Sequence, residues 1–231
     1  MDFSGWEKLS LVDFDDNVTT TLFFAGCNFR CPFCHNSSLV LNPASCPKFK
    51  WESIMEYLKK RQGILDAVCI TGGEPTLMND LLDKMKDIKS LGYLIKLDSN
   101  GSKPEVIKKA FKQGLIDYVA MDIKNCPEKY PLTTGLKEVD MTPIEETVRF
   151  LIDSGIGYEF RTTIIDEHHT EEDIEKLGQF INGAKKCFLQ KFTDSEYCIS
   201  RGLHEVPKEK ALRFKAILEK YVDKVELRNY D

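Results

Sequence analysis

Short apolar runs alternate with longer amphipathic segments along most of the chain. The runs are rich in β-branched and aromatic residues, which is typical of strands. Strands are predicted at Thr20–Phe24, Ala67–Thr71, Tyr93–Asp98, Tyr118–Ile123, Tyr158–Ile165, Cys187–Phe192 and Val225–Arg228. In the segments between them, apolar positions recur with the spacing of one helix face. Helices are predicted at Trp51–Gln62, Leu77–Leu91, Pro104–Gln113, from Thr142 to the residue before Gly155, from Thr170 to near Gly183, and at Lys208–Tyr221.

Two of these helices have specific start signals. Thr142-Pro143-Ile144-Glu145 has the pattern of a capping box with proline at the first helical position. Thr170 precedes an acidic first turn, which suits the positive end of a helix dipole. We therefore expect well-defined helix N-termini at both places.

The alternation of strands and helices predicts the fold class. It implies parallel strands joined by right-handed crossovers, and so an α/β protein. Such units form either a partly closed barrel or an open doubly wound sheet, and both place function at the carboxyl ends of the strands. No repeat, low-complexity tract or flexible linker interrupts the pattern, so we expect a single domain over residues 1–231.

Composition narrows the class of protein. The 231 residues are 42% hydrophobic and 30% charged, as in ordinary globular proteins. The formal charge of −5 argues against nucleic-acid binding as the main function. We see neither a membrane span nor a secretory signal and expect a cytoplasmic protein. In that compartment the eight cysteines are better explained as thiols or metal ligands than as disulfides.

Three cysteines lie close together after the first predicted strand. Cys27, Cys31 and Cys34 have the spacing CxxxCxxC and can converge on a soft metal. Structural zinc normally takes four ligands, and His35 is awkwardly placed to be the fourth. A [4Fe–4S] cluster held by three thiolates leaves one iron open, and we favour this interpretation over zinc.

Polar loops follow three further strands. The second strand ends in Gly72-Gly73-Glu74, where two glycines allow close backbone approach and Glu74 can accept from an ammonium group. The third ends in Asp98-Ser99-Asn100-Gly101 and the fourth in Met121-Asp122-Ile123-Lys124. By alternation, Asp122 and Lys124 share one face of their strand. We expect the polar faces of the strands to point inward, where their charges must be paired or hydrated.

The remaining cysteines and histidines carry weaker signals. Cys69 and Cys187 fall in predicted strands and are expected to be buried and inert. Cys46, Cys126 and Cys198 fall in loops, where a second metal site or a redox pair stays open. His168 and His169 precede an acidic helix start, and we expect them to lie in a solvated loop.

These motifs resemble those of a known superfamily. Cys27, Cys31 and Cys34, with Gly72-Gly73-Glu74-Pro75 one strand later, resemble the radical S-adenosylmethionine (SAM) superfamily. Cys34-His35-Asn36, Asp98-Ser99-Asn100-Gly101 and Met121-Asp122-Ile123-Lys124 resemble activases of glycyl-radical enzymes. The stretches that resemble anaerobic ribonucleoside-triphosphate reductase activating proteins are Asp122–Gly135, Glu159–Ile165 and Leu189–Phe192. The resemblance covers residues 18–195 in the family's order, and implies a partial (β/α)6 TIM-type barrel.

The resemblance also implies a site and a reaction. Cys27, Cys31 and Cys34 would hold a [4Fe–4S] cluster whose open iron binds SAM. No catalytic side chain is implied, since the cluster and SAM carry the chemistry and produce a 5′-deoxyadenosyl radical. SAM contacts implied or inferred from inward-facing positions are Phe33, His35, Gly72, Gly73, Glu74, Asn100, Asp122, Ile123, Lys124 and Arg161. No second cysteine run follows Cys34, which excludes activases with an inserted ferredoxin-like domain.

Three functions are weighed from these features. The leading one is an activase that takes hydrogen from a glycine of a glycyl-radical enzyme, in particular an anaerobic ribonucleotide reductase. A flavodoxin or ferredoxin is the electron donor that the family implies. The second is a radical SAM enzyme with a small-molecule substrate, similar to the carboxy-deazaguanine synthases. The third is a zinc-binding interaction module.

Overall fold

The computed structural model describes residues 2–230, so Met1 and Asp231 of the expected domain lie outside the described residues. The chain forms two compact units. Unit 1 comprises residues 2–28, 38–99 and 103–120. Unit 2 comprises residues 29–37, 100–102 and 121–230.

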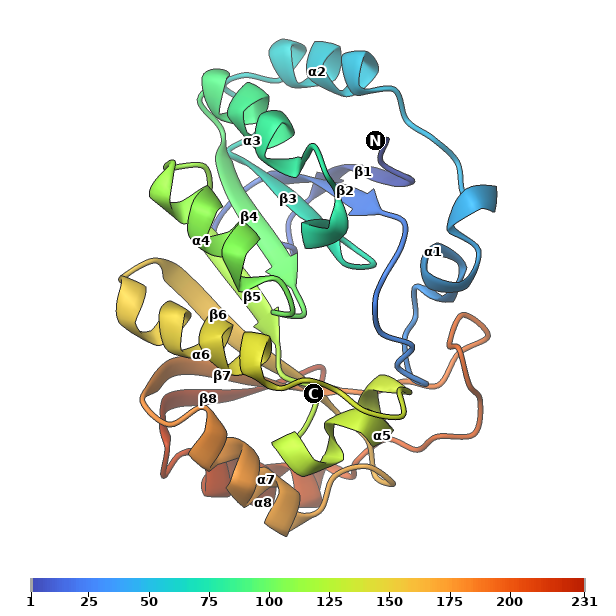
Figure 1. Ribbon diagram of the computed structural model, residues 1–231, viewed down its shortest axis with the longest axis vertical. Helices are drawn as coiled ribbons and strands as arrows, with labels where there is room; N and C mark the ends of the chain where they lie inside the picture. The colour runs from blue at the N-terminus through green and yellow to red at the C-terminus, as the bar shows by residue number, and fades with distance from the viewer. Residues whose placement is uncertain (1, 231) are drawn as a thin grey trace. The chain divides into compact units, whose positions relative to one another are not determined.

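Strands and helices alternate through most of both units (Figure 1). The strands are β1 (Gly5–Ser10), β2 (Thr19–Phe24), β3 (Ala67–Gly72), β4 (Leu94–Ser99), β5 (Tyr118–Asp122), β6 (Gly157–Ile164), β7 (Ala184–Lys191) and β8 (Val222–Arg228). The helices are α1 (Ser37–Leu41), α2 (Trp51–Lys60), α3 (Leu81–Ser90), α4 (Pro104–Lys112), α5 (Tyr130–Thr134), α6 (Thr142–Ser154), α7 (Glu171–Phe180) and α8 (Lys208–Leu218). Short 3₁₀ turns lie at η1 (Pro43–Ser45), η2 (Pro75–Leu77) and η3 (Pro127–Lys129).

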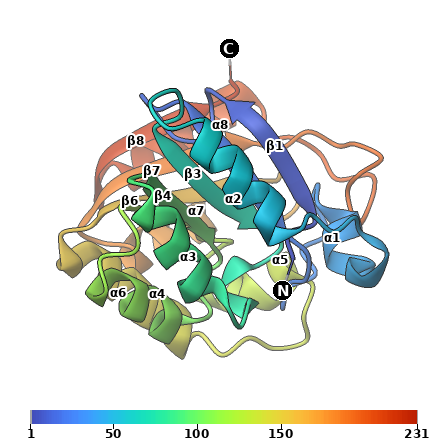
Figure 2. The ribbon, with the colours of Figure 1, turned by 90° about the horizontal axis from the view of Figure 1, so that it is seen from above.

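The sheet follows the chain order from β1 to β8. In unit 1, β2, β3 and β4 pair in parallel. In unit 2, β6, β7 and β8 also pair in parallel. Figure 2 shows α2 and α3 lying along the strands of unit 1. The prediction of an α/β fold with the strand order of a partial TIM-type barrel is confirmed.

The first strand was not predicted. β1 pairs antiparallel with β2, and Trp6 lies opposite Leu22. Its sequence, GWEKLS, contains no apolar run because Glu7 and Lys8 on this edge strand are exposed. The indole Nε1 of Trp6 donates to Thr20 Oγ1 at 2.9 Å and ties the strand down.

One of the two predicted helix caps is wrong. α6 begins at Thr142, but its N-cap is Met141 and no side chain caps the helix. The backbone N–H of Thr142 donates instead to Asp140 Oδ1 at 3.0 Å, an Asx contact that replaces the capping box. At α7 the capping box is present, between Thr170 and Asp173.

A buried lysine within the sheet of unit 1 has several partners. Lys96 of β4 is 4% exposed, and its Nζ donates to the carbonyl of Asp13 at 2.6 Å. The ammonium also lies over the rings of Phe14 and Tyr118.

Cys69 and Cys187 are fully buried as predicted. None of the helices among residues 2–230 combines the length and the apolar character needed to cross a membrane.

Candidate active site

The Gly-Gly-Glu loop packs directly against the backbone that leads to Cys27. Gly73 N–H donates to Phe24 O, and Glu74 N–H donates to Gly26 O, both at 2.8 Å. A Cβ on Gly73 would lie 2.0 Å from the carbonyl oxygen of Gly26. On Gly72, which has φ of +116°, a Cβ would lie 2.4 Å from Phe24 O. Both glycines are therefore required for this backbone contact, whatever ligand they also meet.

Glu74 is fully buried at the start of η2. Its Oε1 accepts hydrogen bonds from the backbone N–H of Thr76 at 3.1 Å, from the hydroxyl of Thr76, and from the hydroxyl of Ser99 at 2.9 Å. These three donors fix the orientation of the carboxylate at the carboxyl ends of β3 and β4. A carboxylate held in this way is preorganised to receive a cation.

Replacing Gly73 with alanine should destabilise the protein by about 3 kcal/mol, since the new methyl group collides with backbone that cannot rotate away. Gly92 is the control because its φ of +87° strains an added side chain, while no atom lies within 4 Å of the added Cβ. Gly92→Ala should cost only about 1 kcal/mol. Urea unfolding of both variants measures the difference, and equal losses would show that the close approach at Gly73 is unimportant.

The cysteine loop is shared between the units, with Cys27 in unit 1 and Cys31 and Cys34 in unit 2. In unit 2 the loop is held by backbone contacts to the end of α5. Arg30 N–H donates to Thr134 O at 2.8 Å, and a Cβ on Gly135 would lie 2.3 Å from Arg30 O. Residues from Asp122–Gly135, which were singled out from sequence, thus support the cysteine loop.

A second segment, residues 192–200, supports the same loop. Ser200 N–H donates to Pro32 O at 2.7 Å. The ring of His35 stacks on Phe192, and its Nε2 lies 2.7 Å from the carbonyl of Thr193. Phe33 is 6% exposed, whereas His35 is an exposed residue. The two aromatic residues of the motif therefore have different environments.

Asp122 joins two cations at the end of β5. Its Oδ2 lies 2.9 Å from Lys124 Nζ, and its Oδ1 lies 2.9 Å from Arg161 Nε. Asp122 and Lys124 share a face, as the alternation predicted. Burial acts to raise the pKa of Asp122, but Arg161 and Lys124 lower the pKa to about 2. Burial acts to lower the pKa of Lys124, but Asp122 holds it above the ordinary value. All three groups are therefore charged at neutral pH.

This charge network lies beside two of the cysteines. The negative charge of Cys31 and Cys34 thiolates adds to the influence of Asp122 in raising the pKa of Lys124. Burial raises the pKa of Cys34, while a backbone N–H of Asn36 and the charge of Lys124 act against it. A thiolate-rich centre carries net negative charge, so a fixed cation next to it is favourable.

The thiols of Cys27, Cys31 and Cys34 are chemically suitable ligands for an iron–sulfur cluster. The motif supplies three thiols, the Gly-Gly-Glu loop is bonded to the residue before Cys27, and a cation accompanies Cys31 and Cys34. Within residues 2–230 no three His, Cys, Asp or Glu side chains are grouped in a way that could hold a metal ion. The assignment of the cluster rests on the chemistry of the three thiols and on their CxxxCxxC spacing.

The two remaining predicted contacts are placed as follows. Asn100 is 5% exposed, and its Oδ1 accepts from the backbone N–H of Ser102 at 3.0 Å. Ile123 is fully buried, and its N–H donates to Arg161 O at 2.9 Å.

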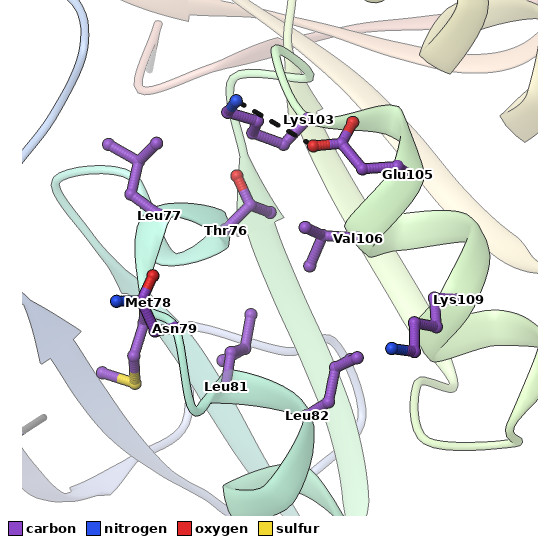
Figure 3. A pocket seen from close by; sticks show the side chains of 10 residues that line it. All are labelled: Thr76, Leu77, Met78, Asn79, Leu81, Leu82, Lys103, Glu105, Val106 and Lys109. Atoms are coloured by element: carbon purple, nitrogen blue, oxygen red, sulfur yellow. Dashed lines mark ion pairs between the residues drawn. The ribbon is translucent and has the colours of Figure 1, made fainter.

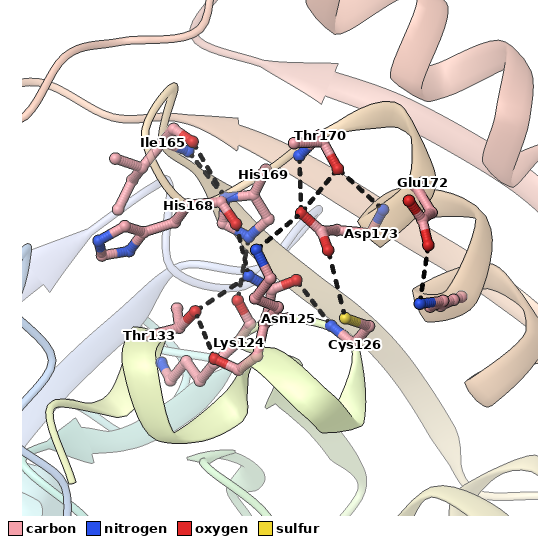
Figure 4. Close-up of polar contacts among 12 residues, drawn as sticks. Lys124, Asn125, Cys126, Thr133, Ile165, His168, His169, Thr170, Glu172 and Asp173 are labelled. Atoms are coloured by element: carbon pink, nitrogen blue, oxygen red, sulfur yellow. Dashed lines mark hydrogen bonds and ion pairs between the residues drawn. The ribbon is translucent and has the colours of Figure 1, made fainter. Parts of the chain in front are cut away.

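The prediction that His168 and His169 lie in a solvated loop is wrong. His168 is 6% exposed and His169 is fully buried. His169 Nδ1 accepts from the N–H of Ile165 at 3.1 Å, and its Nε2 lies 3.1 Å from Lys124 O (Figure 4). Burial lowers the pKa of His169 to about 4, so the ring is neutral and donates to Lys124 O. His169 therefore clamps the end of β5 to the end of β6.

Other unpredicted residues complete this clamp. Asn125 Nδ2 contacts Thr133 Oγ1 at 3.0 Å and His168 O at 2.8 Å. Lys124 N–H lies 3.2 Å from the hydroxyl of Tyr130. The residues that His168 and His169 contact here lie about 40 residues earlier in the chain, so the sequence around the two histidines does not reveal them. The local signal is the His-His pair itself, between a strand and a capping box.

Replacing His169 with alanine should lower the free energy of unfolding by about 3 kcal/mol, because two buried backbone groups lose their partner and a cavity forms. His204→Ala is the control, since His204 is exposed and its imidazole pairs with Glu167 on the surface. It should leave the stability unchanged within error. Thermal or urea unfolding tests this difference, and an unaffected His169→Ala protein would show that the clamp is dispensable.

The three loop cysteines outside the motif have local contacts. Cys126 is 1% exposed, and its thiol lies 3.7 Å from Asp173 Oδ1 of the α7 capping box. Cys198 is 7% exposed and contacts Phe33 O at 3.9 Å. Cys46 contacts the carbonyls of Ser38 and Asn42 at 3.5 Å. These contacts are consistent with structural roles for the three residues.

Unit 1 contains a cavity of about 540 Å³ between η2, α3 and α4 (Figure 3). Leucine side chains line it, and Lys103 pairs with Glu105 at 3.9 Å. None of the site residues predicted from the sequence lines it. We assign this cavity no part in the reaction.

Comparisons with known proteins agree with the fold and the motifs. The Radical SAM superfamily matches residues 21–181. A protein of Methanocaldococcus jannaschii, named as a glycyl-radical enzyme activating enzyme, is 33% identical over 97% of this chain and 95% of its own length. The pyruvate formate-lyase-activating enzyme of Clostridium pasteurianum is 27% identical over 78% of this chain and 75% of its own.

A solved structure shows the same fold. It is a domain of the pyruvate-formate lyase-activating enzyme from Bacteroides vulgatus, with a TM-score of 0.57 and 17% identity. The match covers 70% of this chain and 98% of that domain. The fold and the cysteine motif are those of an α/β enzyme that uses radical chemistry. The chain belongs to the radical SAM superfamily. Its cofactors are a [4Fe–4S] cluster and SAM.

Proposed function

We propose that this chain activates a glycyl-radical enzyme, and that its partner is an anaerobic ribonucleoside-triphosphate reductase. The activation of a glycyl-radical enzyme is supported by the 33% identity, over nearly the whole chain, to a protein named as such an activating enzyme. The second part rests on the stretches that resemble reductase activators, Asp122–Gly135, Glu159–Ile165 and Leu189–Phe192.

The residues take the following roles in this proposal. Cys27, Cys31 and Cys34 hold the cluster, while Gly73 and Glu74 receive the methionine amine. Phe33 and His35 flank the adenosyl group. The remaining contacts to SAM are Gly72, Asn100, Asp122, Ile123, Lys124 and Arg161. When bound, the cluster and SAM supply a 5′-deoxyadenosyl radical, which takes the α-hydrogen of a glycine in the partner.

In this proposal the side chains around the cluster hold one another in fixed positions and offset the charge of the cysteine thiolates. Lys124 offsets the negative charge of Cys31 and Cys34 thiolates. Asp122 holds Lys124 and Arg161 in one geometry through its two oxygens. His169 and Tyr130 fix the backbone of Lys124, so that the network is preorganised. The electron for SAM cleavage comes from a low-potential flavodoxin or ferredoxin in an anaerobic cytoplasm.

The test uses the reduced enzyme, SAM and an anaerobic ribonucleotide reductase under argon. A glycyl-radical EPR signal should appear on the reductase and be absent from a reductase variant whose radical glycine is alanine. Pyruvate formate-lyase serves as the second probe. If 5′-deoxyadenosine forms but neither protein acquires the signal, activation of both partners is refuted. A small-molecule substrate of the carboxy-deazaguanine synthase type would then be favoured.

A further inference from the structure

The two adjacent histidines after β6 differ in one respect. Both ring nitrogens of His169 have backbone partners, at Ile165 and Lys124. His168 is almost as deeply buried, yet its Nδ1 has no hydrogen-bond partner within the described residues. In Figure 4 the ring of His168 points away from the network that surrounds His169.

An unpartnered ring nitrogen in a buried position is unfavourable. Burying a polar atom without a hydrogen bond costs free energy, and an apolar ring in the same place would avoid that cost. The backbone of His168 is already fixed, since its carbonyl accepts from Asn125 Nδ2 at 2.8 Å and its N–H donates to Ile165 O at 3.1 Å. The loop therefore does not need the imidazole to keep its conformation, and the orphaned nitrogen points to a ligand.

The ring of His168 lies against the cysteine loop. Its centroid is 6.4 Å from that of Phe33, and the planes meet at 70°. Phe33 comes directly before Cys34 and is one of the two aromatic residues placed next to the adenosyl group in the proposed function. An adenine edge presents both hydrogen-bond donors and acceptors, and neutral imidazole offers one of each.

The charge state of His168 suits a sulfonium ligand. Burial lowers the pKa of His168 below its ordinary value, Lys129 lowers it further, and Glu167 acts in the opposite direction. The ring is therefore neutral at neutral pH and does not repel the positive sulfur of SAM.

We propose that His168 binds the adenosyl group of SAM through its Nδ1, with its ring packed against Phe33. The inference rests on the proposed function for the presence of SAM and for the side of Phe33 on which the adenosyl group lies. It assigns a specificity-determining contact to a residue outside every motif that identified the superfamily.

Two variants test this contact in the cluster-loaded enzyme. His168→Phe keeps a ring against Phe33 but removes the nitrogen, and His168→Asn retains a polar atom near the δ position. Isothermal titration with S-adenosylhomocysteine and with 5′-deoxyadenosine should show about tenfold weaker binding to His168→Phe. His168→Asn should recover most of that loss. Methionine should bind all three proteins alike, since it lacks the adenosyl group.

Stability provides a second readout. Ligand-free His168→Phe should unfold at the same temperature as the wild type or higher, because it removes a buried unpaired nitrogen. Unchanged affinity for both adenosyl probes in His168→Phe, or equal weakening of methionine, would overturn the inference while the wild type still binds S-adenosylhomocysteine. If the wild type binds neither adenosyl probe, the proposed function itself fails.

Discussion

Replacing Cys27, Cys31 or Cys34 with alanine is expected to abolish the reductive cleavage of SAM. Each variant removes one of three thiolates, and a cluster with too few protein ligands is lost or bound weakly. The measurement is the amount of 5′-deoxyadenosine formed after anaerobic reconstitution and reduction, together with the iron content. Both should fall to background in each variant.

Two other cysteines provide the controls. Cys46→Ala removes a partly exposed thiol whose contacts are two backbone carbonyls. Cys69→Ala removes a fully buried one and should lower stability modestly while leaving turnover nearly intact. If a motif variant still forms 5′-deoxyadenosine at the wild-type rate, the cluster assignment is wrong. A folded but inactive Cys69→Ala protein would contradict the inert role of that residue.

Asp122→Asn should lower the free energy of unfolding by about 2 kcal/mol at neutral pH. The change leaves Lys124 and Arg161 next to each other without their shared anion. A fully buried pair would cost more, but the Asp122 side chain is 32% exposed and solvent screens part of the loss. SAM affinity should fall about tenfold or more, since both cations lose their fixed positions. Asp83→Asn, which breaks an exposed pair with Lys86, should change neither quantity measurably.

The effect of Asp122 should depend on pH in a defined direction. Its pKa lies at about 2 in the folded protein, below the ordinary value of 3.8. A carboxyl group with a lowered pKa stabilises the fold above its ordinary pKa, and this contribution is lost as the pH falls toward the lower value. The difference in unfolding free energy between wild type and Asp122→Asn should therefore be constant from pH 7 to about pH 5 and shrink below about pH 4. A difference that grows in acid would contradict this account of the network.

The periodic part of the fold was predictable because burial imposes a pattern on each element. β3 and the middle of β7, whose consecutive residues are buried, appear as apolar runs, and the structure places both strands within a few residues of the predicted bounds. β1 was missed because an exposed edge strand needs no apolar run. The capping box at Thr142 was predicted from residue types alone, although the neighbouring Asp140 competes for the same backbone N–H.

The supporting contacts of the candidate site were not predictable in the same way. His169 binds a carbonyl 45 residues earlier, and Asn125 binds one 43 residues later. Such contacts depend on the crossover geometry and leave no periodic trace in the sequence. The pair Asp122 and Lys124 was predictable to share a face because alternation along a strand is local. Arg161 joins them only through the neighbouring strand β6.

The central claim is that three thiolates hold a [4Fe–4S] cluster and leave one iron open to SAM. The most direct measurement is electron–nuclear double resonance on the reduced, reconstituted protein with SAM labelled by ¹⁵N at the amine and ¹⁷O at the carboxylate. We expect hyperfine coupling from both labels to the cluster. A cluster whose spectrum is unchanged by labelled SAM, or a protein that takes up zinc in place of iron, would contradict the account.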